Sequence, residues 1–260
     1  MRVDVEDRGP IRVLGLSNPS KRNALTREML SALQLALPGG GSESIETQPT
    51  RVVVLRGDPA GGAFSAGFDI SQIHARERAQ GLNPIDGPAA SLESCACPVI
   101  AALEGPVFGG AFELAMACDL RIAHRGARFC MPPARLGLVY SAEGMQRFLR
   151  ATSASTCKRL FLGAEVLSAE EALRLGLIDR VVDTNLFDET MTWAEDIAAN
   201  APLAVQGMLE GLRMMTMPGS GWADAAARIN ILRQRSIDSE DILEGVAAFV
   251  EKRSPRFRGE

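Results

Sequence analysis

Residues 98–123 read PVIAALEGPVFGGAFELAMACDLRIA, and they alternate between two kinds of regular structure. Residues 98–105 form a short, almost continuous apolar run, which is typical of a strand buried on both faces. A pair of glycines then leads into residues 111–119, which predict a helix, and residues 120–130 predict another strand or a strand pair. Strands that alternate with helices predict an α/β fold.

The pattern continues toward the N-terminus. Residues 3–16 contain two alternating runs around a turn and predict a hairpin. Residues 27–37 are amphipathic, and Thr26 can cap the helix that they predict. Residues 51–57, RVVVLRG, predict another buried strand. The spacer at 39–49 has the composition of a linker, but the apolar pattern resumes at once, so we expect it to join elements of one domain.

Helical signals dominate the second half of the chain. Ser168–Glu171 matches a capping box, and Gly176 stands where the glycine after a helix belongs. Residues 177–183 predict a short strand, and from about Phe187 onward the chain is almost entirely helical in pattern. We therefore expect an α/β core followed by a helical extension that packs on something else.

The composition excludes several classes of protein. The chain has 260 residues, 46% of them hydrophobic and 23% charged, which is ordinary for a soluble protein with a sizeable core. A net charge of −4 provides no general basic field and argues against nucleic acid as a partner. No apolar run approaches membrane-spanning length, and the acidic N-terminus does not resemble a signal peptide. We expect a cytoplasmic protein with no membrane partner.

Cysteine and histidine show no metal-ligand spacing. The two histidines, His74 and His124, are isolated from each other. The five cysteines lie mostly in apolar surroundings: Cys95, Cys97, Cys118, Cys130 and Cys157. We expect buried free thiols in a reducing compartment and no metal site.

Two glycine-rich junctions have the same sequence pattern. FSAGFD at 64–69 and FGGAFE at 108–113 each follow a predicted buried strand, and glycine lets a backbone approach a ligand closely. If the loops converge, one N–H from each could stabilise negative charge that develops on a single oxygen. Two unrelated tight turns are the alternative. Neither loop matches a nucleotide-phosphate motif.

Tyr140 is the only tyrosine in the chain and ends the apolar run LGLVY at 136–140, with Glu143 three residues further on. On these residues alone, Tyr140 is either a packed aromatic or a chemical group aimed into a pocket. Both interpretations stay open at this point.

Several segments together resemble the crotonase (enoyl-CoA hydratase/isomerase) superfamily, in the same order over most of the chain. They are NPSKRNAL at 18–25, AFSAGFDI at 63–70, residues 98–123, LSAEEALRLGLIDRVV at 167–182 and FVEKRSPRF at 249–257. The segments GGAFE and LGLVY, with the tail DSEDILEG, are most similar to the bacterial methylmalonyl-CoA decarboxylases of that superfamily.

The resemblance implies a fold and an assembly. It implies a spiral of ββα turns over residues 1–190 and a helical trimerisation region over 191–260, and a homotrimer or a dimer of trimers. It also implies an acyl-CoA thioester substrate, with coenzyme A present as part of the substrate and no permanently bound cofactor.

The resemblance also implies site residues. Ala66 and Gly110 match the positions expected to supply the two oxyanion-hole N–H groups, and Lys252 matches a lysine that meets the CoA phosphates or adenosine. The residues expected to line the CoA and pantetheine channel are Lys21, Arg22, Ala24, Phe68, Asp69 and Ile70.

The residues that the resemblance assigns to hydration are only partly present. Hydratases of the superfamily hold a water between two glutamates, and the first is present here as Glu113. The second belongs to a PE pair that reads Pro132-Pro133 here, so these prolines border the substrate without a carboxylate. Because adding water needs both a base and an acid, ordinary hydration is disfavoured unless Glu143 takes part.

Decarboxylation requires less of the protein, since the departing group leaves its electrons in the thioester enolate. Tyr140 falls where the decarboxylase relatives carry a site tyrosine, but Phe68 replaces their histidine and would favour a more apolar acyl group. Three hypotheses stay open: a decarboxylating lyase, an isomerase or atypical hydratase that uses Glu113 or Glu143, and a non-catalytic acyl-CoA-binding protein.

Overall fold

The computed structural model describes residues 1–39, 49–72, 83–217, 219 and 221–260, so most of the predicted spacer lies outside the described residues. A six-stranded sheet forms the centre, in the order β1-β2-β3-β4-β6-β9. Its strands are β1 (Arg2–Arg8), β2 (Ile11–Ser17), β3 (Val52–Gly57), β4 (Val99–Leu103), β6 (Leu120–His124) and β9 (Arg180–Val182). β1 and β2 pair antiparallel as the predicted hairpin, and the other neighbours are parallel. The predicted α/β class is confirmed.

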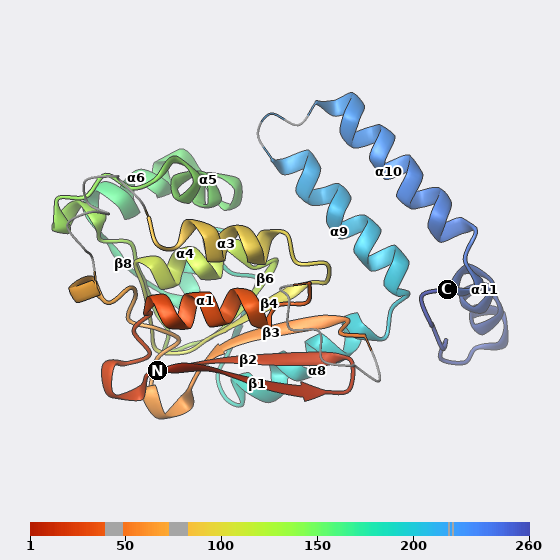
Figure 1. Ribbon diagram of the computed structural model, residues 1–260, viewed down its shortest axis with the longest axis horizontal. Coiled ribbons are helices and arrows are strands. Elements are labelled where there is room, and N and C mark those ends of the chain that lie inside the picture. The colour runs from red at the N-terminus through yellow and green to blue at the C-terminus, as the bar shows by residue number, and fades with distance from the viewer. Residues whose placement is uncertain (40–48, 73–82, 218, 220) are drawn as a thin grey trace.

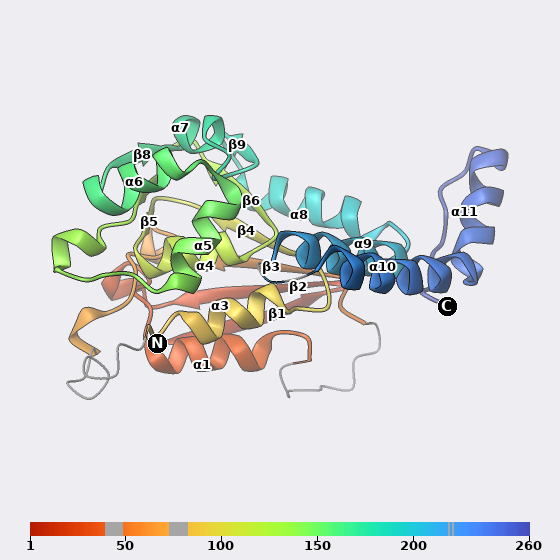
Figure 2. The same ribbon diagram turned by 90° about the horizontal axis from the view of Figure 1, so that it is seen from above.

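Helices cover both faces of the sheet (Figures 1 and 2). One face carries α1 (Arg27–Ala36), α3 (Asp86–Glu93) and α4 (Gly110–Ala117), and the other carries α8 (Leu186–Ala198). In β3, Val53 and Leu55 join the cluster with α1, whereas Val52 and Val54 join the cluster with α8. This double burial explains why the strand reads as a continuous apolar run. Thr26 caps α1 as predicted, accepting a hydrogen bond from the N–H of Met29.

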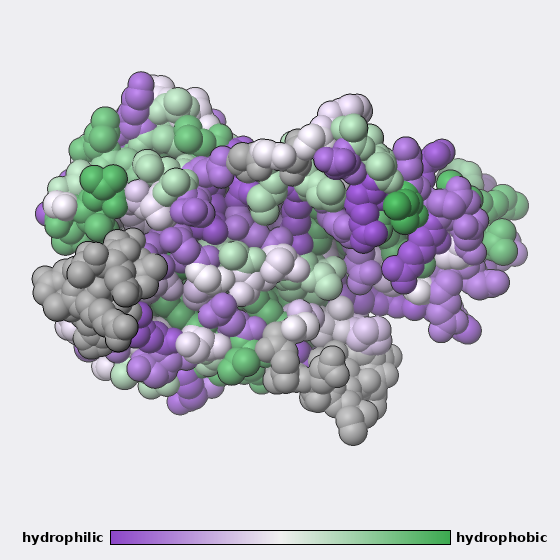
Figure 3. All heavy atoms as spheres, turned by 45° about the horizontal axis from the view of Figure 1, so that its top comes forward, coloured by the Kyte–Doolittle hydropathy of each residue, from purple (hydrophilic) through white to green (hydrophobic). Residues whose placement is uncertain are grey.

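The C-terminal helices project away from the sheet (Figures 1 and 2). They are α9 (Pro202–Thr216), α10 (Trp222–Ile237) and α11 (Glu240–Glu251). The expected boundary at residue 190 falls inside α8, whose Met191 and Ala194 pack on the sheet. Hydrophobic surface is visible at the α11 end of the molecule (Figure 3), where Phe249 is 87% exposed. No helix in the described part of the chain is long and apolar enough to cross a membrane.

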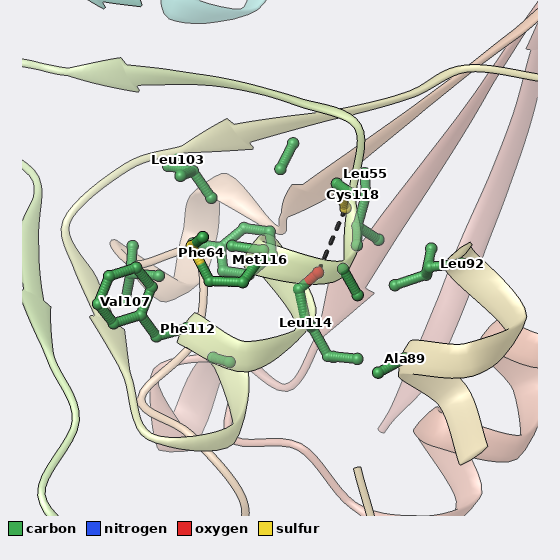
Figure 4. Close-up of a cluster of buried hydrophobic side chains, with 14 of the residues drawn as sticks. Leu55, Phe64, Ala89, Leu92, Leu103, Val107, Phe112, Leu114, Met116 and Cys118 are labelled. Carbon is green, nitrogen blue, oxygen red and sulfur yellow. Dashed lines mark hydrogen bonds between the residues drawn. The ribbon is translucent and has the colours of Figure 1, made fainter. Parts of the chain in front are cut away.

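The larger of the two hydrophobic clusters includes the side chains around α4 (Figure 4). Phe64, Phe112 and Leu114 are completely buried, and burying such a side chain contributes about 1.5–3 kcal/mol. The thiol of Cys118 donates to the carbonyl of Leu114 over 3.4 Å. The five cysteines are all buried and free, as predicted.

A small second sheet, β5-β7-β8, supports the loops above α4. Its strands are β5 (Pro106–Phe108), β7 (Arg128–Cys130) and β8 (Val166–Ser168), and helices α5 (Ala142–Ala151), α6 (Ala154–Gly163) and α7 (Ala169–Arg174) lie beside it. The predicted capping box opens α7: Ser168 Oγ accepts from the N–H of Glu171, and the Glu171 carboxylate accepts from the N–H of Ser168. Gly176 has a φ of +75°, as its predicted place after the helix requires.

Candidate active site

The two glycine-rich loops converge. The N–H of Phe108 donates to the carbonyl of Ser65 over 3.3 Å, and Ser65 pairs with Val107 as a parallel bridge. Gly67 has a φ of +103°, and a Cβ there would lie 2.7 Å from the carbonyl oxygen of Phe108 and 3.9 Å from the nitrogen of Gly110. Only glycine permits this approach without strain, so the position brings the backbone of one loop against the other.

The structure differs from the prediction at Ala66, because its N–H already donates to the carbonyl of Arg22 over 3.0 Å. The N–H groups of Gly67 and Asp69 are also bonded, to Ser65 Oγ and to the carbonyl of Leu25. The N–H of Phe68, between them, has no acceptor within the part of the chain that the structure describes.

Gly110 lies directly beside Phe68. A Cβ on Gly110 would be 3.8 Å from the Cβ of Phe68. Gly110 is the first residue of α4, where backbone N–H groups have no partner within the helix and carry the positive end of its dipole. Phe68 and Gly110 therefore have neighbouring N–H groups without an acceptor among the described residues, whereas the N–H of Ala66 is bonded.

Glu113, one turn into α4, is completely buried. Its Oε1 accepts from Arg147 Nη1 over 2.7 Å, and its Oε2 accepts from the Tyr140 hydroxyl and from Asn83 Nδ2, the latter over 3.2 Å. Burial raises the pKa of Glu113 above its ordinary value, and these three donors oppose that rise.

Tyr140 is held between this carboxylate and an aromatic neighbour. Its ring packs on Phe161 of α6 with centroids 5.6 Å apart. Burial, and next the charge of Glu113, raise the pKa of Tyr140 well above its usual value, so the phenol is neutral at physiological pH. The Tyr140 side chain thus packs as a core aromatic and also brings a hydroxyl to the buried carboxylate.

The start of α5 places Tyr140. Ser141 caps the helix by accepting from the N–H of Gly144 over 3.1 Å, and its hydroxyl donates to Asp86 of α3 over 2.9 Å. A Cβ at Gly144 would lie 2.5 Å from the Tyr140 ring, so glycine is needed there. The sequence SAEG therefore both starts the helix and makes room for the tyrosine.

Sequence reasoning missed the side chains that surround Glu113. Besides Asn83, these are Arg147, which also donates to Glu93 of α3 over 2.9 Å, and Asp86, which lies 3.5 Å from Arg147. A signal was available for Arg147, because it shares the buried stripe of α5 with Gly144 and Phe148 at helical spacing.

The other reaction candidates lie apart from this cluster. Glu143 is exposed in the first turn of α5. Pro133 is buried at the start of a 3-10 turn and Pro132 is half-buried, so the place of the second hydratase glutamate carries no carboxylate.

The residues predicted to bind coenzyme A lie in two places: six of them lie together near Phe68, and Lys252 lies apart from them. Lys21 Nζ lies 2.8 Å from Asp69, and this contact, together with hydrogen bonds from Ser71, lowers the pKa of Asp69 to about 2. Leu25 forms a bridge with Phe68, which brings the segment of Lys21, Arg22 and Ala24 beside Phe68, Asp69 and Ile70. Lys252 ends α11, at the opposite end of the molecule from α5 and α6, and the chain does not bring it to this site (Figures 1 and 2).

Metal ligands are not grouped here: the described ranges contain no cluster of three or more His, Cys, Asp or Glu side chains placed to hold an ion.

The chain belongs to the enoyl-CoA hydratase/isomerase family, whose model matches residues 6–260. It is 32% identical to the methylmalonyl-CoA decarboxylase of Escherichia coli K12, over 99% of this chain and 98% of that protein. It is 29% identical to the mitochondrial methylglutaconyl-CoA hydratase of Mus musculus, over 99% of this chain and 82% of that protein.

Solved structures agree on the fold. An enoyl-CoA hydratase from Bacillus anthracis matches with a TM-score of 0.89 at 29% identity, covering 99% of both chains. An enoyl-CoA hydratase subunit from Geobacillus kaustophilus matches with a TM-score of 0.86 at 32% identity, over 99% of this chain and 98% of that chain. The protein is an acyl-CoA-processing enzyme of the crotonase fold, as the sequence resemblance implied. Because the relatives include a decarboxylase and hydratases, the reaction has to be argued from the site.

Proposed function

We propose that the protein is an acyl-CoA lyase that decarboxylates a short 2-carboxyacyl-CoA through an enolate held at the N–H groups of Phe68 and Gly110. One observation carries the proposal. Of the two positions that hold carboxylates in hydratases, Glu113 is buried and bonded to Arg147, and Pro133 has no acid at all. A site with one carboxylate, already paired with a cation, is poorly equipped to add water across a double bond.

Decarboxylation suits the groups that are present. The bond between Cα and the carboxylate breaks, CO₂ departs, and the electron pair passes into the thioester enolate, whose charge rests on one oxygen. Two backbone N–H groups, one of them at the N-terminus of α4, match that charge. Removing one such donor typically costs about 3–4 kcal/mol of transition-state stabilisation. The product then needs one proton at Cα.

Tyr140 is the group that we assign to this reaction in particular. It carries a neutral hydroxyl bonded to Glu113, three residues after Gly110 on α4, and its position is fixed by Phe161 and Glu113. A neutral donor of this kind can orient the substrate carboxylate or take part in protonation at Cα. The apolar ring of Phe68 favours an acyl group that is apolar apart from its 2-carboxylate.

Coenzyme A would enter as part of the substrate, beside the Lys21–Asp69 pair, and this chemistry requires no bound cofactor. We also propose a homotrimer or a dimer of trimers. Exposed apolar side chains on α11, among them Leu243, Val246 and Phe249, support an assembly that buries them.

Isomerisation of an enoyl-CoA is the second candidate, because burial raises the pKa of Glu113 toward the range of a proton carrier. Arg147 and Tyr140 occupy the same carboxylate and weigh against it.

A substrate panel separates the candidates. The purified protein is incubated with methylmalonyl-CoA, ethylmalonyl-CoA, crotonyl-CoA and a 3-enoyl-CoA, and the products are followed by mass and absorbance. We expect loss of CO₂ from the malonyl-type thioesters and no gain of water by crotonyl-CoA. Hydration of crotonyl-CoA or movement of the double bond, without any CO₂ release, would overturn the proposal.

A further inference from the structure

Arg147 is a buried cation shared between two helices. Its side chain is only 4% exposed, on α5, and it reaches Glu113 of α4 with Nη1 over 2.7 Å and Glu93 of α3 with Nη2 over 2.9 Å. Burying such a group is costly unless each charge is matched by a well-placed partner. The fork of the guanidinium meets this need by bonding one carboxylate with each end.

The hydrogen bonds of Glu113 define its protonation state. Oε1 faces Arg147, which can only donate, and Oε2 faces both Tyr140 and the amide of Asn83. A carboxylic acid would have to give its own proton to one of these donors, so the arrangement fits the carboxylate form. With Glu113 an anion, the Tyr140 hydroxyl donates its hydrogen bond to Glu113.

The charged groups around Glu113 come from two packed helices. Asp86 and Glu93 of α3 are acidic and share Arg147 with Glu113, at 3.5 Å and 2.9 Å, and the charge of Asp86 opposes a negative charge on Glu113. On α5, Arg147 contacts Glu113 directly, whereas Arg150 pairs with Glu93. In the part of the chain that the structure describes, Arg147 is thus the cation that contacts this carboxylate and offsets its acidic neighbours.

We propose that Arg147 is a positioning residue that holds Glu113 as an anion and thereby fixes the Tyr140 hydroxyl as a donor to Glu113 in the substrate-free protein. The proposal rests on the proposed function only for the role of Tyr140 in catalysis. It follows that Arg147 sets the pH at which Glu113 takes up a proton and the Tyr140 hydroxyl is released toward the pocket.

The sequence offers a direct probe, because Tyr140 is the only tyrosine in the chain. Protein made with tyrosine labelled with ¹³C at Cζ gives a single tyrosine resonance. That resonance changes when the acceptor of the hydroxyl changes from a carboxylate to a carboxylic acid. A pH titration of the substrate-free protein therefore reports protonation of Glu113, and the Glu113→Gln variant, which lacks the transition, identifies it.

Two substitutions are expected to move the midpoint in opposite directions. Arg147→Gln removes the cation and should raise the midpoint by about one pH unit or more, since a charge partner in contact shifts a carboxyl pKa by about 1–3 units. Glu93→Gln removes a competing anion and should lower the midpoint. Arg150→Gln, which alters the same ion network without touching Glu113, is the matched control and should move it least.

A purely structural role for Arg147 would not move the titration midpoint in opposite directions in Arg147→Gln and Glu93→Gln. Equal midpoints in wild type and Arg147→Gln, or a higher midpoint in Glu93→Gln, overturn the proposal. If Arg147→Gln does not fold, the direction measured for Glu93→Gln still decides. Because no substrate is present, the titration can succeed or fail independently of the CO₂-release assay that tests the proposed function.

Discussion

Gly67→Ala tests whether the close approach of the two loops builds the oxyanion site. The added Cβ would lie 2.7 Å from the carbonyl oxygen of Phe108, whereas ordinary contact begins at 3.4 Å, so the loops must separate by about 0.7 Å. That displacement acts directly on Phe68, the next residue. Because a misplacement of about 1 Å can cost about 100-fold in rate, and one oxyanion donor about 100- to 1000-fold, kcat should fall within that range.

Backbone strain has to be separated from this effect. Alanine at a positive φ costs about 1–2 kcal/mol wherever it occurs. Gly9→Ala is the matched control, because Gly9 has a φ of +59° in the β1–β2 hairpin and nothing lies within 4 Å of its added Cβ. Urea unfolding should show a lower free energy of unfolding in both variants. The rate of CO₂ release from methylmalonyl-CoA should fall only in Gly67→Ala. A folded Gly67→Ala protein with a kcat within threefold of wild type would refute the reasoning.

Three further substitutions follow from the structure. Ser168→Ala breaks the capping box of α7 and should lower the free energy of unfolding by about 1 kcal/mol while leaving turnover unchanged; unchanged denaturation midpoints would contradict this. Glu143→Gln should keep wild-type kcat and KM, because the side chain is exposed in the first turn of α5, and a tenfold loss would return Glu143 to the reaction. Glu113→Gln should change how stability depends on pH. The folded-state pKa of Glu113 is raised, so this carboxyl group stabilises the wild-type protein at low pH, and the contribution is lost as pH rises through that pKa. The difference in free energy of unfolding between wild type and Glu113→Gln, measured by urea unfolding, should therefore shrink from acid to neutral pH.

The sheet and its helices could be predicted because their signals are local. Residues 51–57 read as a doubly buried strand, and β3 is buried on both faces. The capping box at Ser168 depends on side chains three residues apart, which the sequence displays directly. The packing of α8 could not be predicted, since its amphipathic pattern does not state whether its apolar face meets the sheet or another helix.

The site was predicted only in part, because it depends on contacts between distant segments. Which N–H of FSAGFD stays unbonded is decided by the carbonyl of Arg22, more than 40 residues away in the chain, and the motif alone pointed to Ala66. Arg147 was not predicted as a site residue, although its spacing from Gly144 and Phe148 places it on the buried stripe. A buried ion pair between α4 and α5 becomes visible only when both helices are in place.

CO₂ release from methylmalonyl-CoA by the Tyr140→Phe variant tests the central claim most directly. The substitution removes the hydroxyl that donates to Glu113 and should cost about 1.5–3 kcal/mol of stability, typical of a hydrogen bond to a charged group. Loss of a positioned proton donor should lower kcat by about 100-fold or more in protein shown to be folded. A folded Tyr140→Phe protein that releases CO₂ at the wild-type rate would contradict the account.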